Sequence, residues 1–472
     1  MIDRLDTAPL WSEHRSLILK HAPPFIAGIG PKAPFNVRRQ EIEATLLRLF
    51  SCADQTTPRL GVLANNPLVS IPKLVKHDED HDVLIMTDLG ELPNLSDVFT
   101  DLGGGLPGGT SSTYAATHAV WNANEAAFSN LGQRLGNFFA DLHSPRTLAE
   151  ARMLLSEMGK DLSNPAARDI VLEGAIKPVG DQLKRFPDLV DADEAARLFG
   201  ILVDDFRREN NQEEESLVLG DCWTGAILVS APSGESETGT DKKSMKIGVI
   251  DWEFASVGRG AHGDMAQFLA HLELLSISAF QSLRFVTHQS AIETLMDSMI
   301  STYRERSAHQ VTRQSQSSTA GNDLGDDDGS LRYTKAARSA LLCHGAEIIN
   351  NAFWKKWRCV RSDCPLWGTP HSDEARIHEC TLIKNMVMSG LQCLRMAMHK
   401  QTAVGHENGH PFSRAASAPG SRILDLFHDN NDRSDRLFEE SISVPRFDNS
   451  TVEPGVQSVR SMPSAIVAVP PV

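Results

Sequence analysis

The 472-residue sequence lacks an excess of positive charge, a membrane-length apolar run and a clustered set of cysteines. It carries 46 Lys and Arg against 61 Asp and Glu, a net charge of -15, so we expect neither nucleic acid nor an anionic membrane as a general partner. Residues 1–20 lack the apolar core of a secretory signal. The seven dispersed cysteines fit reduced thiols and hence a cytoplasmic protein, and Cys359 and Cys364 have no second close pair to complete a zinc site.

Two acidic residues flank one predicted β-hairpin. The apolar runs at 227–230 and 245–250 predict two strands, and the polar, Gly- and Ser-rich segment 231–244 predicts the turn between them. Asp221 comes just before the first strand and Asp251 just after the second. Because a hairpin brings its outer ends together, we expect both carboxylates to face one small volume.

Paired carboxylates of this kind fit the transfer of a phosphoryl group. One carboxylate accepts the hydroxyl proton of the acceptor, and another holds the magnesium ion that neutralises the phosphates. If the strand continues past residue 250, Asp251 and Glu253 project to the same face, because side chains alternate with a period of two. We therefore predict Asp221 as the catalytic base and Asp251 and Glu253 as ligands of Mg²⁺. The alternative is that each aspartate caps a turn beside a strand.

These two segments resemble the catalytic loop and the metal segment of the aminoglycoside phosphotransferase and choline kinase family. Within it they are most similar to methylthioribose kinase and its fungal relatives. Gly220–Asp221 and Asp251–Glu253 match the family's Gly-Asp and Asp-x-Glu patterns. Leu219 stands where a histidine is usual, and Ala226 stands where an asparagine or serine offers an oxygen to a second metal. The resemblance implies an α+β, two-lobed protein kinase-like fold with a small β-rich N-terminal lobe, a large and mainly helical C-terminal lobe, and ATP as the phosphate donor.

A kinase-like lobe pair also needs a lysine for the ATP phosphates and a glutamate that orients it. An apolar run ends at Lys20 and is followed by prolines that end a strand. Residues 42–50 form an apolar stripe at helical spacing, bordered by Glu43. The resemblance places the glutamate four residues after an arginine, as from Arg39 to Glu43, so we predict Lys20 and Glu43 as nucleotide-binding residues. Alternatively, Lys20 is a solvated strand-end lysine and Glu43 an exposed helix residue.

Residues 83–90 predict the hinge between the lobes, a strand that passes into a loop. Their order of a methionine, an acidic residue and a leucine resembles the methylthioribose kinase hinge. We therefore expect Met86 and Asp88 to border the bound nucleotide. The alternative is a buried strand that ends in a turn, which holds whatever the function.

Two further segments predict support for the catalytic loop and the core. Asp264 opens a predicted helix, where its carboxylate can accept from free backbone N–H groups, and the resemblance implies that Asp264 braces the catalytic loop. Upstream, a long helix ends near His143, which we interpret as a helix-end or packing histidine. Gly132 and Gly136 on that helix permit another element to approach closely.

The chain divides into three regions. We predict an N-terminal lobe and hinge at 1–90, a C-terminal lobe at 91–400 with a disordered insert at about 307–331, and a disordered tail at 401–472. Within the tail, Leu424–Phe427 could form a brief helix or docking motif.

The expected N-terminal lobe is incomplete. Relatives begin with a strand, a glycine turn and another strand that cover the ATP phosphates, whereas this sequence reaches Lys20 almost at once, so we expect these strands to be missing. The segment Gly28–Ala33 imitates a dinucleotide-binding fingerprint, but Pro31 and Pro34 interrupt the helix that such a motif must open, so we read it as a connection.

The sequence therefore predicts an ATP- and Mg²⁺-dependent kinase that acts on a hydroxyl group of a small molecule. The alternative is a catalytically degenerate kinase-like binding or scaffold protein, which Leu219, Ala226 and the missing phosphate-covering strands favour. Family resemblance does not identify the acceptor.

Overall fold

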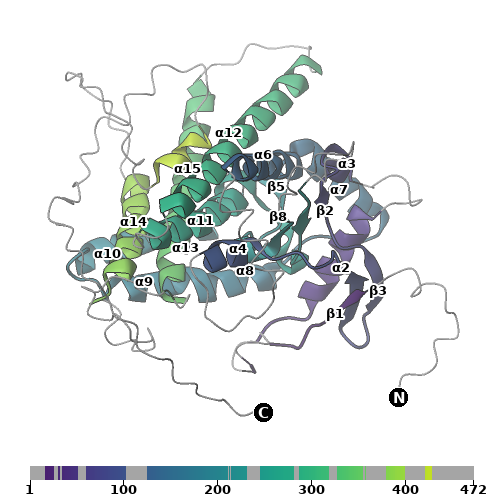
Figure 1. The fold of residues 1–472 in the computed structure, drawn as a ribbon, viewed down its shortest axis with the longest axis horizontal. Helices are drawn as coiled ribbons and strands as arrows, with labels where there is room; N and C mark the ends of the chain where they lie inside the picture. The colour runs from purple at the N-terminus through teal and green to yellow at the C-terminus, as the bar shows by residue number, and fades with distance from the viewer. Residues whose placement is uncertain are drawn as a thin grey trace, which may run out of the picture.

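The computed structural model describes residues 16–25, 30–31, 34–51, 60–102, 125–210, 212, 214–230, 245–280, 286–317, 327–354, 357, 379–398 and 420–427. Helices predominate and the strands form three small sheets, so the fold is α+β. Figure 1 shows strands β1 and β3 with helix α2 at one end of the molecule and most of the long helices at the other. No helix in the described part of the chain is long and apolar enough to cross a membrane.

An antiparallel sheet of three strands carries the predicted lysine. Its order is β1 (Leu17–His21), β4 (Val83–Thr87), β3 (Leu74–Asp78). Lys20 is opposite Leu84 in this sheet, and two prolines follow β1, as predicted for its end. Helix α2 (Arg38–Phe50) packs beside the sheet and buries most of its residues, including Leu46, Leu47 and Leu49, which are fully buried.

Two smaller sheets position the acidic segments. Strands β6 (Ile227–Val229) and β7 (Ile247–Val249) pair antiparallel, as predicted for the hairpin arms, and β2 (Val69–Ser70) joins β7 in parallel. The predicted turn 231–244 lies outside the described residues. Strand β5 (Glu215–Val218) pairs with β8 (Ser256–Arg259), so the chain approaches Asp221 from one sheet and leaves it into the other.

Helices α6 (Glu125–Leu142) and α12 (Val286–Ser317) lie side by side (Figure 1) and pack closely at two glycines of α6. A Cβ atom added at Gly132 or Gly136 would lie 2.4 or 2.5 Å from backbone carbonyl oxygens of α12. The predicted close approach along this glycine face is confirmed. The remaining helices are α3 (Gly61–Asn65), α4 (Leu95–Leu102), α7 (Pro145–Glu157), α8 (Pro165–Val171), α9 (Lys177–Leu183), α10 (Ala192–Arg207), α11 (Ala266–Phe280), α13 (Asp327–Trp354), α14 (Thr381–Met398) and α15 (Ser421–Asp425), with short 3-10 and π-helical turns between them.

Two segments predicted to be disordered contain helix. Helix α12 continues to Ser317 and α13 begins at Asp327, so helix occupies most of 307–331, and residues 318–326 lie outside the described residues. The Ser- and Gln-rich run to residue 317 contains no Gly or Pro, and Ser or Gln lowers helix stability by only a fraction of a kcal/mol per residue.

In the tail, α15 forms where a brief helix was predicted, one turn earlier than Leu424–Phe427. Ile423 is fully buried and Leu426 is 7% exposed, because α15 packs against α12 and α13. The prediction that all of 401–472 is disordered is therefore wrong for 420–427, where a few apolar residues dock on the helices. The rest of the tail lies outside the described residues.

Candidate functional site

The loop that carries Asp221 is held by its own glycine and by a distant aspartate. Gly220 has φ +83°, and a Cβ at this position would lie 2.1 Å from the carbonyl oxygen of Phe254, so only glycine fits both the backbone conformation and the contact. The backbone N–H groups of Leu219 and Gly220 donate to the Asp264 carboxylate, at 2.7 and 3.0 Å. Asp264 thus lies where the sequence predicted a brace for this loop.

Asp221 itself is partly buried beside other acids. Its Oδ1 accepts a hydrogen bond from Gln267 Nε2 at 3.1 Å. Burial, followed by repulsion from Asp251, raises the pKa of Asp221 to about 7, and the hydrogen bond from Gln267 opposes this rise. A carboxylate with a pKa near neutrality can exchange a proton readily at physiological pH.

Asp251 does not stand on a strand. Strand β7 ends at Val249, Asp251 has φ +65°, and a 3-10 turn (Trp252–Phe254) follows. The expectation that Asp251 and Glu253 share a strand face is therefore wrong as a geometric argument, because the left-handed residue ends the strand. Both carboxylates nevertheless approach the same cation, since they lie 2.6 and 3.8 Å from Nζ of Lys20.

Lys20 joins the two ends of the site. Its Nζ donates to both oxygens of Glu43, at 2.8 and 3.1 Å, and to Asp251 Oδ1 at 2.6 Å. Glu43 is 2% exposed. The alternative of a solvated lysine and an exposed glutamate is therefore wrong. Burial alone would lower the pKa of Lys20, but the three surrounding carboxylates outweigh burial and raise it above its ordinary value.

Sequence reasoning missed the role of Arg39, which it used only to locate Glu43. The Arg39 side chain is buried; its Nε lies 3.4 Å from Glu253 Oε2, and its other nitrogens donate to the carbonyl oxygens of Phe35 and Pro23 at 3.1 and 3.0 Å. The available signal was its place one helical turn before Glu43, on the buried face of α2. Arg39 therefore ties Glu253 to the helix that carries Glu43.

Met86 lies on β4, and Asp88 follows its last residue, Thr87. Met86 is 5% exposed and is opposite Ile18, which is 45% exposed. Directly opposed residues of an antiparallel pair share a face, so Ile18 and Met86 lie on the face of Lys20. Asp88 accepts hydrogen bonds from Ser16 Oγ and the Gly90 N–H, at 2.8 and 2.9 Å, so it caps the turn after the strand.

The donor set suits Mg²⁺ only with help from a ligand. Among the residues that the structure describes, no group of three or more His, Cys, Asp or Glu side chains could hold a metal ion by itself. Mg²⁺ is usually bound by one or two carboxylates together with substrate phosphates and water. The two hard carboxylate donors Asp251 and Glu253 fit that requirement. Both carboxylates repel the charge of Asp221, and a cation bound between them would reduce this repulsion.

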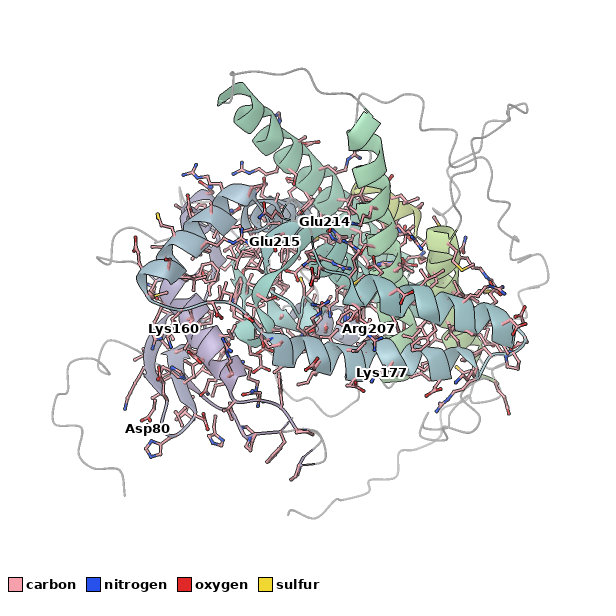
Figure 2. The ribbon with its side chains drawn as sticks, turned by 180° about the vertical axis from the view of Figure 1, so that it is seen from behind. Asp80, Lys160, Lys177, Arg207, Glu214 and Glu215 are labelled. Atoms are coloured by element: carbon pink, nitrogen blue, oxygen red, sulfur yellow. The ribbon has the colours of Figure 1, made fainter. Side chains whose placement is uncertain are left out.

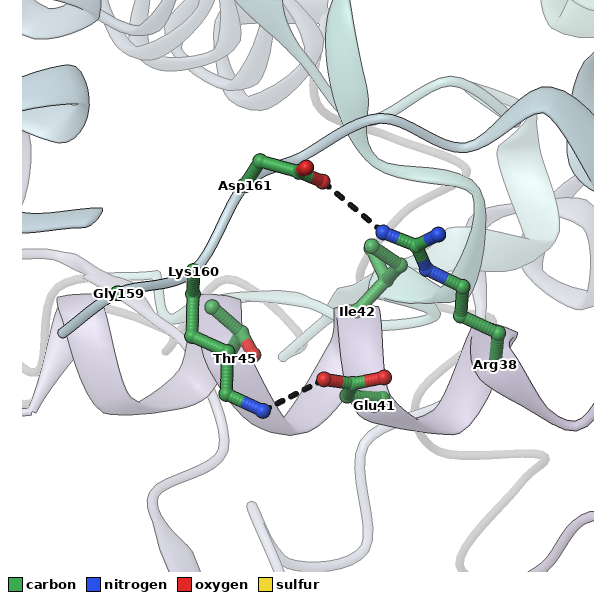
Figure 3. Close-up of a pocket in the computed structure, with 7 residues that line it drawn as sticks. All are labelled: Arg38, Glu41, Ile42, Thr45, Gly159, Lys160 and Asp161. Atoms are coloured by element: carbon green, nitrogen blue, oxygen red, sulfur yellow. Dashed lines mark hydrogen bonds and ion pairs between the residues drawn. The ribbon is translucent and has the colours of Figure 1, made fainter. Parts of the chain in front are cut away.

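A cavity of about 230 Å³ lies on the other side of α2, between this helix and residues 159–161 (Figure 3). Its charged groups pair with one another, Lys160 Nζ with Glu41 at 2.6 Å and Arg38 with Asp161 at 2.9 Å. In the opposite view, Lys160 lies near α2 (Figure 2), and none of the predicted site residues lines this cavity. We therefore do not place the chemistry here.

Comparisons with known proteins point to kinases of small molecules. No protein-family model matches the chain. It is 27% identical over 303 residues to a 4-hydroxytryptamine kinase of Psilocybe cubensis, covering 63% of this chain and 69% of that protein. It is 24% identical over 265 residues to a 4-hydroxytryptamine kinase of Psilocybe cyanescens, covering 56% of this chain and 62% of that protein. The matches thus span about two thirds of these relatives.

Solved structures give only weak similarity. Plasmodium vivax ethanolamine kinase aligns with a TM-score of 0.32 and 13% identity, covering 81% of this chain and 76% of that one. A glucosamine kinase aligns with a TM-score of 0.32 and 14% identity, covering 72% and 69%. These TM-scores are too low to support an argument. The similarity to small-molecule kinases therefore rests on the two sequence relatives.

Proposed function

We propose that this protein is an ATP-dependent phosphotransferase with a two-lobed protein kinase-like fold, which transfers a γ-phosphoryl group to a hydroxyl of a small molecule. One observation carries the proposal. Nζ of Lys20 lies 2.8 Å from Glu43 and 2.6 Å from Asp251, and Asp251 is 231 positions away from the lysine in the sequence. A lysine oriented by a glutamate and facing a metal-binding aspartate is the arrangement that aligns and neutralises ATP phosphates.

Each acidic residue has a proposed role. Asp221 accepts the proton of the acceptor hydroxyl, and its raised pKa, near 7, suits a general base. Asp251 and Glu253 hold Mg²⁺, which supplies charge neutralisation for the phosphates when bound. Asp264 holds the backbone of the loop that carries Asp221.

The nucleotide lies, in this proposal, against the face of the sheet that carries Lys20. Lys20, oriented by Glu43, contacts the phosphates after leaving Asp251. Ile18, which is 45% exposed, offers apolar surface on this face to the adenine ring, the buried Met86 lies opposite Ile18 at the border of the nucleotide, and Asp88 caps the hinge turn beside it. Residues 1–90 then form the N-terminal lobe and hinge, and residues 91–400 the C-terminal lobe.

For the acceptor, we propose a hydroxylated aromatic amine as the first class to screen. The two relatives are named for 4-hydroxytryptamine, a compound of this class. Trp223, two residues after the proposed base, is partly exposed, and its ring lies 6.2 Å from that of His271. An aromatic side chain beside the base can stack on an aromatic acceptor. Aliphatic amino alcohols and sugars are the comparison set.

A coupled ADP-release assay tests the proposal. Wild-type protein with Mg²⁺-ATP and an acceptor panel is compared with Asp221→Asn, which keeps the size of the side chain but removes the base. We expect Mg²⁺-dependent, acceptor-dependent ADP release that falls by about 10²- to 10⁴-fold in the variant. Lys184→Met, at a side chain that is 70% exposed, is the control and should match wild type.

A second candidate is a degenerate kinase-like protein that binds nucleotide without transfer. It is favoured by Ala226, which is fully buried and offers no oxygen, and by Leu219. Stabilisation by Mg²⁺-ATP in a thermal-shift assay, without ADP release on any acceptor, would select this reading over the enzyme.

A further inference from the structure

We propose that His143, the residue after α6, is a positioning residue for the catalytic loop and acts through Asp264. The inference rests on the proposed function, since the loop that it holds carries Asp221. From the sequence alone, His143 was interpreted as a helix-end or packing histidine. His143 reaches this loop through Asp264, which accepts hydrogen bonds from the loop backbone.

The contacts form one chain of hydrogen bonds. His143 is 6% exposed; its Nε2 lies 3.3 Å from Asp264 Oδ2 and its Nδ1 lies 3.1 Å from the Tyr303 hydroxyl. Asp264 is 3% exposed, and its two oxygens also accept from the backbone N–H groups of Leu219 and Gly220. The path therefore runs from Tyr303 on α12 through His143, just after α6, and Asp264 to the catalytic loop.

The hydrogen-bond network assigns the tautomer of His143. An ionised carboxylate only accepts, so the proton lies on Nε2, and the Tyr303 hydroxyl then donates to Nδ1. Loss of the imidazole would leave the buried Asp264 carboxylate with only backbone donors in this network. Losing a donor destabilises a buried acceptor, and the catalytic loop is bonded directly to this carboxylate through the N–H groups of Leu219 and Gly220.

The surrounding backbone is shaped for this ring. Gly260 begins the π-helical turn (Gly260–Met265) that carries Asp264. A Cβ at Gly260 would lie 2.6 Å from Cγ of His143, so any larger residue displaces the imidazole. Gly260→Ala is therefore an independent way to disturb the same contact. The nucleotide cluster around Lys20 has no hydrogen bond or ion pair with this network among those that the structure describes, so its function should be affected less.

The experiment compares His143→Leu with His143→Gln. Leucine keeps bulk without polar atoms, whereas the glutamine amide can donate to Asp264 and accept from Tyr303. We expect His143→Leu to lower kcat by about tenfold to hundredfold with KM for ATP within about twofold of wild type, and His143→Gln to recover most of kcat. Gly260→Ala should resemble His143→Leu.

Hydrogen exchange provides a readout that needs no activity. In His143→Leu, exchange at residues 219–222 should quicken more than along α6 itself, and His143→Gln should restore it. Equal exchange at 219–222 in wild type and His143→Leu, or uniform loosening of α6 that glutamine does not reverse, would overturn the inference. If His143→Leu does not fold, His143→Gln and Tyr303→Phe decide by the same exchange measurement. Wild type without activity on any acceptor would count against the proposed function instead.

Discussion

Replacing Lys20 by methionine removes one cation from among three carboxylates. The Nζ atom lies 2.8 Å from Glu43, 2.6 Å from Asp251 and 3.8 Å from Glu253. Methionine keeps an unbranched, flexible apolar stem, so the change is largely confined to the charge. Lys20→Arg keeps the charge and serves as the conservative comparison.

The expected loss of stability follows from these distances and from exposure. Opposite unit charges at 2.8 Å attract by roughly 6 kcal/mol at an effective dielectric constant of 20, and the cost of desolvation offsets most of this. Breaking a buried pair costs about 3–5 kcal/mol. Because the Lys20 side chain is 32% exposed, we expect the free energy of unfolding to fall by a smaller amount, about 1–3 kcal/mol.

In Lys20→Met, stabilisation by ATP should be smaller than in wild type, and stabilisation by Mg²⁺ alone should be larger. Wild type with ATP at 100 times its Kd gains about 2.7 kcal/mol, and the variant should gain clearly less at the same concentration, because its phosphates lose their cation. Mg²⁺ alone should stabilise the variant more than wild type, because Lys20 no longer competes for Asp251. Glu43, 2% exposed, then lacks its partner and should take up a proton.

Differential scanning fluorimetry without ligand, with Mg²⁺, with ATP and with both measures the loss of stability and the responses to ATP and to Mg²⁺. Lys184→Met, exposed at the surface, is the control for loss of a lysine. If Lys20→Met shows the same Mg²⁺-ATP response as wild type and no greater response to Mg²⁺ alone, the assignment of the phosphate site to this cluster is refuted.

Three further predictions follow from other contacts. Because the proposed base Asp221 has a pKa raised to about 7, kcat should fall about tenfold per pH unit below that value. Gln267→Leu removes a hydrogen bond that lowers this pKa, so it should move the acid limb of the kcat–pH profile to higher pH, and an unmoved limb would argue against Asp221 as the base. Gly220→Ala should lower the free energy of unfolding by about 2–5 kcal/mol in urea titration, since it adds left-handed strain to a clash with backbone, and a loss under 1 kcal/mol contradicts the loop geometry. Lys160→Met should change the free energy of unfolding by less than about 1 kcal/mol, because the lysine and its partner Glu41 are about equally exposed. A larger loss would show that this ion pair helps to hold α2 in place.

Much of the site could be predicted from short-range patterns. Apolar runs and turn residues place Asp221 and Asp251 at the two ends of paired strands, and the structure pairs these strands. Helical spacing places Glu43 on α2, and the structure brings it to Lys20. These predictions depend on the periodicity of strands and helices and on a family pattern, which short segments of the sequence are enough to show.

The parts that could not be predicted depend on single backbone angles or on distant contacts. The left-handed Asp251 ends the strand early, so the strand-face argument for Glu253 was wrong although its carboxylate is near the cation. Arg39 and His143 are bonded to residues more than a hundred positions away, and no local pattern shows that. Composition likewise gave a disordered tail, because the few apolar residues of 420–427 are too short a run to change its average.

The central claim is that Asp221 and Asp251 act on one phosphoryl group. Its most direct test is ADP release, coupled to product detection by phosphorus NMR, for wild type, Asp221→Asn and Asp251→Asn with Mg²⁺-ATP and a panel of hydroxylated aromatic amines. We expect a phosphate ester with wild type only, retained ATP binding in Asp221→Asn, and ATP binding that no longer depends on Mg²⁺ in Asp251→Asn. Ester formation that persists in both variants would contradict it.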